Sequence, residues 1–304
     1  MADDTAQRGL RPVHDAALAH IVRRLSRAQD APWLHGEVAR RMAQRLGLVR
    51  LQPRVVLDWW SFNGASQALL QQAYPRARLQ SVEVDDTLLQ RTSLNKPARW
   101  WPVRRATGQG VPPVPPQAVG AGGAELLWAN MMLHLVPNPA ALMQQWRSAL
   151  AVDGFLMFST LGPGTLTGLR STYARLGWPA AHAPFVDMHD LGDMLLHAGF
   201  ADPVMDQEIL TLTWPDARAL LGELRSLGGN ADTRRAPGLR TPRWRERLCA
   251  ELLCLAGSDG RLRLDVEVVY GHAFVAAPKP RIAAQTTVAL DEMRAMVRSP
   301  RAGS

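Results

Sequence analysis

Cysteine and lysine are both scarce in this 304-residue chain. The two cysteines, Cys249 and Cys254, stand five positions apart, which fits neither a metal-binding pair nor a disulfide framework. We therefore expect no metal site and two reduced cysteines that pack as small apolar side chains. Lys96 and Lys279 are the only lysines among 35 basic residues, so arginine supplies most of the positive charge behind the formal net charge of +8.

The chain also lacks long apolar runs. Its longest apolar stretch, Glu125–Val136, contains Asn130 and His134, so no membrane-spanning segment is expected. The N-terminus is acidic and has no apolar segment of the kind found in secretory signals, which favours the cytoplasm.

Basic residues do not alternate with aromatic ones as they do in proteins that bind single-stranded nucleic acid, so nucleic acid is not an expected partner. One basic group is nevertheless dense. It consists of six arginines, which we call the arginine cluster: Arg234, Arg235, Arg240, Arg243, Arg245 and Arg247. Such a cluster predicts either an acidic protein partner or an ordinary solvated surface.

The order of apolar segments predicts the fold class. Apolar residues spaced as on helices fill residues 13–47, and Asp30–Pro32 divides them into two helices. Beyond them, strands and helices alternate, which predicts an α/β fold with a mostly parallel sheet covered on both faces. The expected strands are Arg54–Trp59, Ala77–Val84, Arg99–Val103, Leu126–Asn130, Phe155–Ser159, Val204–Thr213 and Leu264–Phe274.

The helices and the domain limits follow from the same patterns. The expected helices are Ala65–Gln72, Asp86–Ser93, Pro139–Leu150, Thr165–Leu176, His189–Ala198, Ala217–Leu227 and Pro242–Leu255. Asp187 is expected to cap a helix rather than to bind a metal, and Gly199 to end that helix. One domain is expected over residues 13–276, with a helical insertion at about 215–257 and flexible ends at 1–12 and 277–304.

The turn after the first strand has the spacing of a loop that binds a nucleotide-type cofactor. Such loops carry glycines at alternate positions, because a residue without Cβ lets the backbone approach the ligand. After Asp58 these positions hold Trp60, Phe62 and Gly64, so one of three glycines remains. The loop therefore predicts a cofactor site whose residues are unusually bulky.

Ligands of open α/β sheets lie outside the carboxyl ends of the strands. The second strand ends at Glu83, which stands 25 residues after Asp58, where an acid can bind both hydroxyls of a ribose. The fourth strand ends at Asn130, followed by His134. No acid follows the third strand, where one commonly holds an adenine amine.

Several further motifs, taken in order, resemble those of class I S-adenosylmethionine-dependent methyltransferases. The resemblance is closer still to the BioC-type malonyl-ACP O-methyltransferases of biotin synthesis, and it runs from about Leu34 to Phe274. The motifs are His35–Met42, Leu126–His134, Gly154–Pro163, Val186–Leu195, Ala198–Asp206, Leu227–Asn230 and Glu267–Phe274.

The resemblance implies a seven-stranded sheet whose last strand is antiparallel, and methyl transfer from S-adenosylmethionine to the free carboxylate of a malonyl thioester. By position, the cofactor would contact Asp58, Trp60, Phe62, Gly64, Glu83 and Asn130. His134 would lie beside the acceptor, and Arg225 or Arg240 would orient its carboxylate. The implied partner is an acidic acyl carrier protein.

A second interpretation stays open, because function depends on the site and not on the fold. The bulk of Trp60 and Phe62 could close the cofactor site, which would leave a catalytically inactive protein that binds partners or acts as a scaffold.

Overall fold

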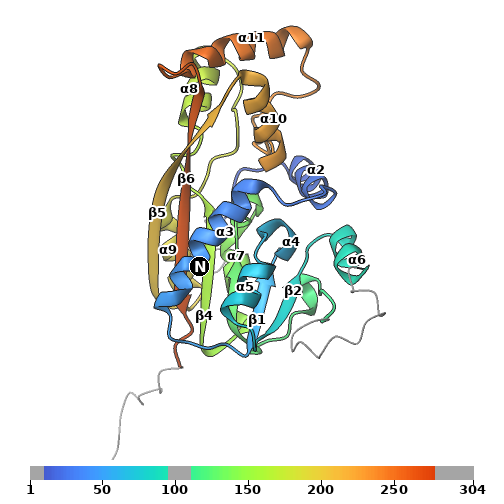
Figure 1. Ribbon diagram of the computed structural model, residues 1–304, viewed down its shortest axis with the longest axis vertical. Helices are drawn as coiled ribbons and strands as arrows, with labels where there is room; N and C mark the ends of the chain where they lie inside the picture. Colours follow the sequence, from blue (N-terminus) through green and yellow to red (C-terminus); the bar gives the residue numbers. More distant parts are fainter. Residues whose placement is uncertain (1–9, 95–110, 278–304) are drawn as a thin grey trace, which may run out of the picture.

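The computed structural model describes residues 10–94 and 111–277 (Figure 1). Residues 1–9, the strand expected at 99–103 and the tail from 278 onward lie outside the described residues. The helices are α2 (Asp15–Ser26), α3 (Trp33–Arg45), α4 (Ser61–Gly64), α5 (Gln67–Ala73), α6 (Asp86–Leu94), α7 (Pro139–Ala149), α8 (Thr167–Arg175), α9 (Met188–His197), α10 (Ala217–Leu227) and α11 (Pro242–Leu252), with short 3₁₀ turns η1 (Leu46–Leu48), η2 (Pro116–Ala118), η3 (Leu133–Leu135) and η4 (Leu253–Leu255). The strands are β1 (Val55–Trp59), β2 (Arg78–Val82), β3 (Ala124–Ala129), β4 (Leu150–Leu161), β5 (Ala201–Trp214) and β6 (Leu262–Phe274).

Within the described residues, six strands form one sheet in the order β2-β1-β3-β4-β6-β5. β1 pairs in parallel with β2 and β3, and β3 pairs in parallel with β4. β6 runs antiparallel to both β4 and β5, so it alone opposes the direction of the others. This confirms the predicted α/β fold with an antiparallel last strand. The sheet has six strands here where seven were expected, because the remaining one was expected at 99–103.

Helices cover both faces of the sheet, because successive residues of a strand point to opposite sides. Val56 of β1 packs in a core with Leu34 of α3 and Leu70 of α5. The next residue, Leu57, belongs to the core on the other face together with Trp146 of α7. The strand ends between these two layers are where the sequence places the candidate site.

A third, smaller core lies beyond the main sheet. β5 and β6 stay paired as far as Trp214 and Leu262, whereas β4 pairs with β6 only from Phe155 to Leu161. The extended pair packs against α8, α10 and α11 through residues that include Leu220. We call α10, α11 and the loop between them the roof. It stands at the top of Figure 1 and corresponds to the predicted helical insertion.

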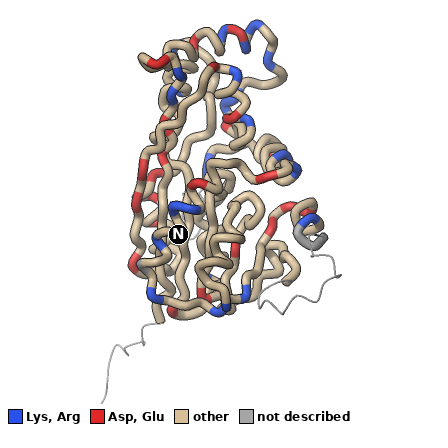
Figure 2. The backbone as a smooth tube through the Cα atoms, viewed as in Figure 1, with Lys and Arg blue, Asp and Glu red and all other residues tan. Residues whose placement is uncertain are grey.

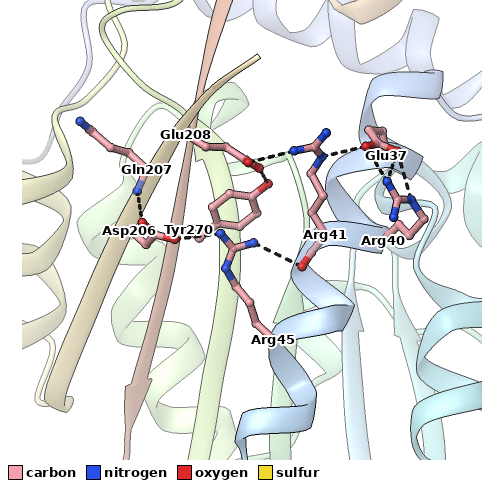
Figure 3. Close-up of polar contacts among 8 residues, drawn as sticks. All are labelled: Glu37, Arg40, Arg41, Arg45, Asp206, Gln207, Glu208 and Tyr270. Atoms are coloured by element: carbon pink, nitrogen blue, oxygen red, sulfur yellow. Dashed lines mark hydrogen bonds and ion pairs between the residues drawn. The ribbon is translucent and has the colours of Figure 1, made fainter.

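A polar network fixes α3 against the far edge of the sheet (Figure 3). Arg41 forms an ion pair with Glu208 of β5 at 2.9 Å, and the Tyr270 hydroxyl of β6 donates to the same carboxylate. The Arg45 guanidinium lies 3.8 Å from the centre of the Tyr270 ring. Because these contacts anchor the C-terminal half of α3, they also set the position of His35 near its start.

Local predictions met mixed outcomes. Asp187 Oδ1 accepts a hydrogen bond from the His189 amide at 2.8 Å, which confirms its capping role. Gly199 has φ 88°, as expected of a glycine that ends a helix. The expectation that both cysteines are packed away was wrong for Cys254, which is exposed, while Cys249 is half-buried.

Among the described residues, no helix is both long and apolar enough to cross a membrane.

Candidate active site

The loop after β1 makes a tight turn at the strand ends. Trp60 has φ 56°, in the left-handed region that large side chains seldom adopt. Its amide donates to the Val82 carbonyl at 2.7 Å, and its carbonyl accepts from the Gly64 amide at 2.8 Å, which closes the single turn α4. The backbone turn expected of a cofactor loop is therefore present, although a tryptophan stands at its first glycine position.

The two bulky rings of this loop have different surroundings. Trp60 is 5% exposed and belongs to the large core that α2 and α7 share with the sheet. Phe62 is half-buried, and the Arg91 guanidinium of α6 lies 4.5 Å from its ring centre. Arg91 also donates to the carbonyls of Ser26 and Ala28 at the end of α2. Phe62 therefore lies on the α6 side of the loop, beside the end of β2.

Two buried carboxyl groups lie under the loop. Asp58 Oδ2 accepts from the Ser61 hydroxyl at 2.6 Å, and Glu83 Oε1 accepts from the Phe62 amide at 2.8 Å. Asp58 Oδ1 and Glu83 Oε2 are buried and have no partner. Burial raises the pKa of Asp58 to about 7, and burial together with the charges of Asp58 and Asp85 raises the pKa of Glu83 to about 8.

Asn130 joins three elements at the end of β3. Its Nδ2 donates to the carbonyls of His35 at 2.8 Å and Gly64 at 2.7 Å, and its Oδ1 accepts from the Ser159 hydroxyl at 2.6 Å. Both polar atoms of the amide thus have partners within the protein, and the residue is fully buried. The structure places Asn130 as a tie between α3, the loop and β4.

His35 presents an unused acceptor beside the loop. Its Nδ1 lies 2.7 Å from the Asn63 carbonyl oxygen, which can only accept, so Nδ1 carries the proton. Burial lowers the pKa of His35 to about 4, which keeps the ring neutral and leaves Nε2 as an acceptor. That Nε2 has no partner, and neither amide atom of the buried Asn63 side chain has one.

His134 lies in η3, just after the end of β3. Burial, and then the neighbouring His35 and Arg11, lower the pKa of His134 well below its ordinary value, so its ring is neutral at pH 7. Its Nδ1 has no partner, and its ring meets Phe185 edge-on at a centroid distance of 6.1 Å.

The loop after β4 packs closely against the Glu267 side chain of β6. The Gly164 amide donates to the Glu267 carboxylate, and the Gly162 amide donates to the Glu267 carbonyl at 2.9 Å. A Cβ at either glycine would collide with Glu267. The glycines therefore let the loop lie against β6, which sets the position of Thr165 in the wall of the neighbouring cavity.

A cavity of about 500 Å³ opens between these strand ends and the roof. Two predicted catalytic residues, His134 and Arg225, both line it. Its apolar wall includes Leu34, Met131, Leu166, Leu169, Leu221, Leu224 and Trp244. Its titratable lining residues are Arg11, Arg24, His35, His134, Tyr173, His182, Arg225 and Arg240, with no aspartate or glutamate among the described residues that form it. The arrangement suits an anion with an apolar body.

Comparisons with known proteins agree with this geometry. No protein-family model matches the chain. A malonyl-acyl-carrier-protein O-methyltransferase from Laribacter hongkongensis is 37% identical over 253 residues, which cover 82% of this chain and 84% of the relative. Its namesake from Gallionella capsiferriformans is 36% identical over 250 residues, 81% of this chain and 85% of the relative. The chain belongs to the malonyl-acyl-carrier-protein O-methyltransferase family.

A solved structure supports the fold alone. A candidate methyltransferase from Bacillus halodurans C-125 superposes with a TM-score of 0.53 at 12% identity, covering 78% of this chain and 99% of that one. The family assignment confirms the resemblance inferred from the motifs, and the structural likeness confirms the expected fold.

S-adenosylmethionine, the cofactor implied for this family, fits the unused polar atoms at the strand ends. Glu83 Oε2, Asp58 Oδ1 and the Asn63 amide are buried and lack partners, and a ribose hydroxyl or an ammonium group could satisfy them. Glu83 keeps the position predicted for it at the end of β2. The fit is therefore good in polar groups, while Phe62 adds bulk beside them.

The structure brings several of the predicted site residues together. Asp58, Glu83, Gly64 and the loop aromatics do come together at the strand ends, and His134 and Arg225 share the cavity. Arg240 lines the cavity as well. The prediction assigned no role to Arg11 or to the ring of His35, although both line the cavity; the arginine had no recognisable motif, and the histidine was noted only as the start of one.

Proposed function

We propose that this chain transfers a methyl group from S-adenosylmethionine to the free carboxylate of a malonyl thioester carried by an acyl carrier protein, as a step of cytoplasmic biotin synthesis. The observation that carries the proposal is the cavity beside the strand ends, whose lining, over the part of the chain that the structure describes, offers cations and apolar groups but no acid. A short acyl chain that ends in a carboxylate matches both properties.

The protein groups in this cavity suit a reaction that needs no general base. A carboxylate is already ionised at neutral pH, and S-adenosylmethionine supplies a methyl group on a sulfonium, so methyl transfer moves no proton. His134 and His35 are neutral because burial lowers the pKa of each. Their task is then to shape the site and exclude water, while catalysis depends on alignment of the reacting groups.

The strand ends would hold the cofactor. Glu83 would accept hydrogen bonds from the ribose hydroxyls through its free Oε2, while its Oε1 holds the loop through the Phe62 amide. Asp58 would support the loop through Ser61. Asn130 would act as a positioning residue, because its amide ties the loop to α3 and β4.

The roof offers a surface for an acidic carrier protein. Figure 2 shows basic residues gathered along α11 and the loop before it. Of the arginine cluster, Arg235 is half-buried and the other members are exposed. Leu239, in the same loop, is fully exposed. A basic surface around one apolar side chain suits a partner whose own surface is acidic with an apolar spot.

The proposal is tested by supplying S-adenosylmethionine with a labelled methyl group and malonyl-acyl carrier protein. We expect base-labile label on the carrier protein, because a methyl ester releases methanol in alkali. Acetyl-acyl carrier protein, which lacks the free carboxylate, is the matched control and should gain no label. Absence of label on malonyl-acyl carrier protein, together with absence of S-adenosylmethionine binding by calorimetry, would refute the proposal and favour the inactive interpretation.

A further inference from the structure

Arg11 is a buried cation in the wall of the cavity. It is 8% exposed, and its guanidinium donates to the carbonyl oxygens of His134, Val136 (3.4 Å) and Pro184 (2.8 Å). These bonds fix the guanidinium beside η3 and beside the segment that precedes α9. They use carbonyl groups alone, so they leave its positive charge without a counter-ion.

No carboxylate within residues 10–94 and 111–277 forms an ion pair with Arg11, and its buried Nε has no hydrogen-bond partner. Two buried acids directly follow lining residues in the sequence, and both have other partners: Asp232 is paired with Arg234 at 3.2 Å, and the Glu267 carboxylate accepts from the Gly164 amide. Burial lowers the pKa of Arg11 to about 10, so the group still carries its charge at neutral pH. A buried charge without a partner is costly, which makes a bound anion the expected compensation.

The other basic groups of the cavity are less suited to that role. Burial lowers the pKa values of His35, His134 and His182, so these rings are neutral. Arg24 is half-buried and donates to the Arg225 carbonyl at 2.8 Å. Arg225 and Arg240 are exposed, where water and salt screen their charges. Within the described lining, Arg11 is thus the one permanent charge that is buried.

We propose that Arg11 binds the carboxylate of the acyl acceptor and selects acyl groups that end in an acid over neutral ones. This rests on the proposed function, because it takes the acceptor to be a malonyl thioester. The apolar residues around the cavity, such as Leu34 and Leu169, contact the rest of the acyl chain. The carboxylate supplies the negative charge that Arg11 lacks as a partner. The Nε–H of Arg11, which has no partner, can donate a hydrogen bond to it.

The test compares two ligands that differ in one charge, malonyl-pantetheine and its methyl ester, by calorimetry without cofactor. The parent protein should bind the acid more tightly than the ester. Arg11→Gln should weaken binding of the acid by about tenfold or more, because the pair is buried, and leave the ester unchanged. Arg11→Lys keeps the charge but loses the planar guanidinium with its paired N–H donors, so its affinity for the acid should lie between those of the parent and Arg11→Gln.

The matched control is Arg147→Gln. Arg147 also donates to a backbone carbonyl of a distant segment, that of Gly199 at 3.0 Å, but it does not line the cavity. It should leave both affinities unchanged. Equal weakening of acid and ester by Arg11→Gln or Arg11→Lys would show a purely structural role and overturn the proposal, as would a parent protein that binds the acid no better than the ester.

The outcome separates this inference from the proposed function. Selective binding of the acid that depends on Arg11, without methyl transfer, would leave the carboxylate site standing and refute the enzyme activity. Methyl transfer with KM and kcat unchanged in Arg11→Gln would support the activity and refute the carboxylate site.

Discussion

The Phe62 amide donates a hydrogen bond to Glu83 Oε1 at 2.8 Å, which ties the loop after β1 to the end of β2. The bond leaves the second carboxylate oxygen of Glu83 buried and without a partner. One side chain therefore serves two purposes, because it fixes the loop with one oxygen and offers the other to a ligand.

Glu83→Ala should abolish binding of S-adenosylmethionine, because the ribose hydroxyls would lose the side-chain oxygen that accepts their hydrogen bonds at this strand end. Glu83→Gln should weaken binding less, since the amide oxygen can still accept from Phe62 and hold the loop. Calorimetry measures both affinities, and thermal denaturation reports any loss of fold. Asp86→Asn removes an exposed acid three residues further on and should bind as the parent does. Equal binding by parent and Glu83→Ala would show that the strand-end assignment is wrong.

Removing the loop aromatics should strengthen cofactor binding. We expect Trp60→Gly with Phe62→Gly to raise the affinity for S-adenosylmethionine, and mainly through Phe62, because its ring adds bulk beside the strand ends whereas the Trp60 ring packs in the core. Phe62→Leu keeps apolar bulk and serves as the control, so it should gain less than Phe62→Gly. Tight binding by the parent chain, with turnover of malonyl-acyl carrier protein, would contradict the idea that the rings obstruct the site.

The same pair of changes should lower stability, and mostly through Trp60. Glycine in place of an ordinary residue costs about 1 kcal/mol. Trp60 is 5% exposed, however, and loss of a buried tryptophan costs about 3–5 kcal/mol. Relief of the left-handed backbone at φ 56° returns about 1–2 kcal/mol. Urea denaturation of each single variant separates these contributions, and Phe62→Gly should lose less than Trp60→Gly.

Stability should fall as pH rises from about 7 to 8. Folding raises the pKa of Asp58 from 3.8 to about 7 and that of Glu83 from 4.5 to about 8, so in this range the folded protein holds protons that the unfolded chain has released. The stabilising effect of those protons is lost as pH passes the folded pKa values. His35 and His134 act in the opposite sense, because the unfolded chain still protonates part of them near pH 6.5 while burial keeps both neutral in the folded protein, so the decline is expected above about pH 7.

The measurement is the free energy of unfolding in urea at half-unit steps of pH. Glu83→Gln should flatten the decline between pH 7 and 8, and Asp58→Asn should flatten it near pH 7. Asp193→Asn, which removes an exposed acid of α9, should leave the slope as in the parent. A parent protein whose stability rises across this range would contradict the assignment of raised pKa values.

Reversing charge in the arginine cluster should weaken association with an acyl carrier protein. Arg243 and Arg247 are exposed on α11, so Arg243→Glu with Arg247→Glu changes the roof surface without disturbing a core. The loss should shrink as salt rises, because exposed charges are screened beyond a Debye length of about 10 Å at 0.1 M. Surface plasmon resonance at two salt concentrations measures this, with exposed Arg76→Glu as the control. An affinity for the carrier protein that does not change with salt would show that the arginine cluster does not contribute to association.

The sequence predicted elements well where apolar spacing was regular. Helix α10 has the bounds that were expected, 217–227, because its apolar positions repeat at helical intervals between Asp216 and Gly228. β4 is longer than expected and begins at Leu150, which was assigned to the preceding helix. Leu150 is buried either way, so periodicity alone could not separate the end of α7 from the start of the strand.

The candidate site could be placed from the sequence only where it follows strand ends. Asp58 and Glu83 were expected to lie close together, and do, because parallel strands present their carboxyl ends at one edge of the sheet. Arg11 could not be found in this way, since it contacts His134, 123 positions away, through a backbone carbonyl that any residue could supply. Contacts to main-chain atoms leave no pattern in residue type.

The extension of β5 and β6 beyond the other strands has a dynamic consequence. An isolated two-stranded ribbon is marginally stable and easily twisted, whereas the central sheet is held on both sides. The roof depends on this ribbon and on its own small core, so its backbone amides should exchange with solvent hydrogen sooner than those of β1 and β3. Transient loosening of the ribbon would admit an acyl chain to the cavity while the strand ends beneath stay rigid.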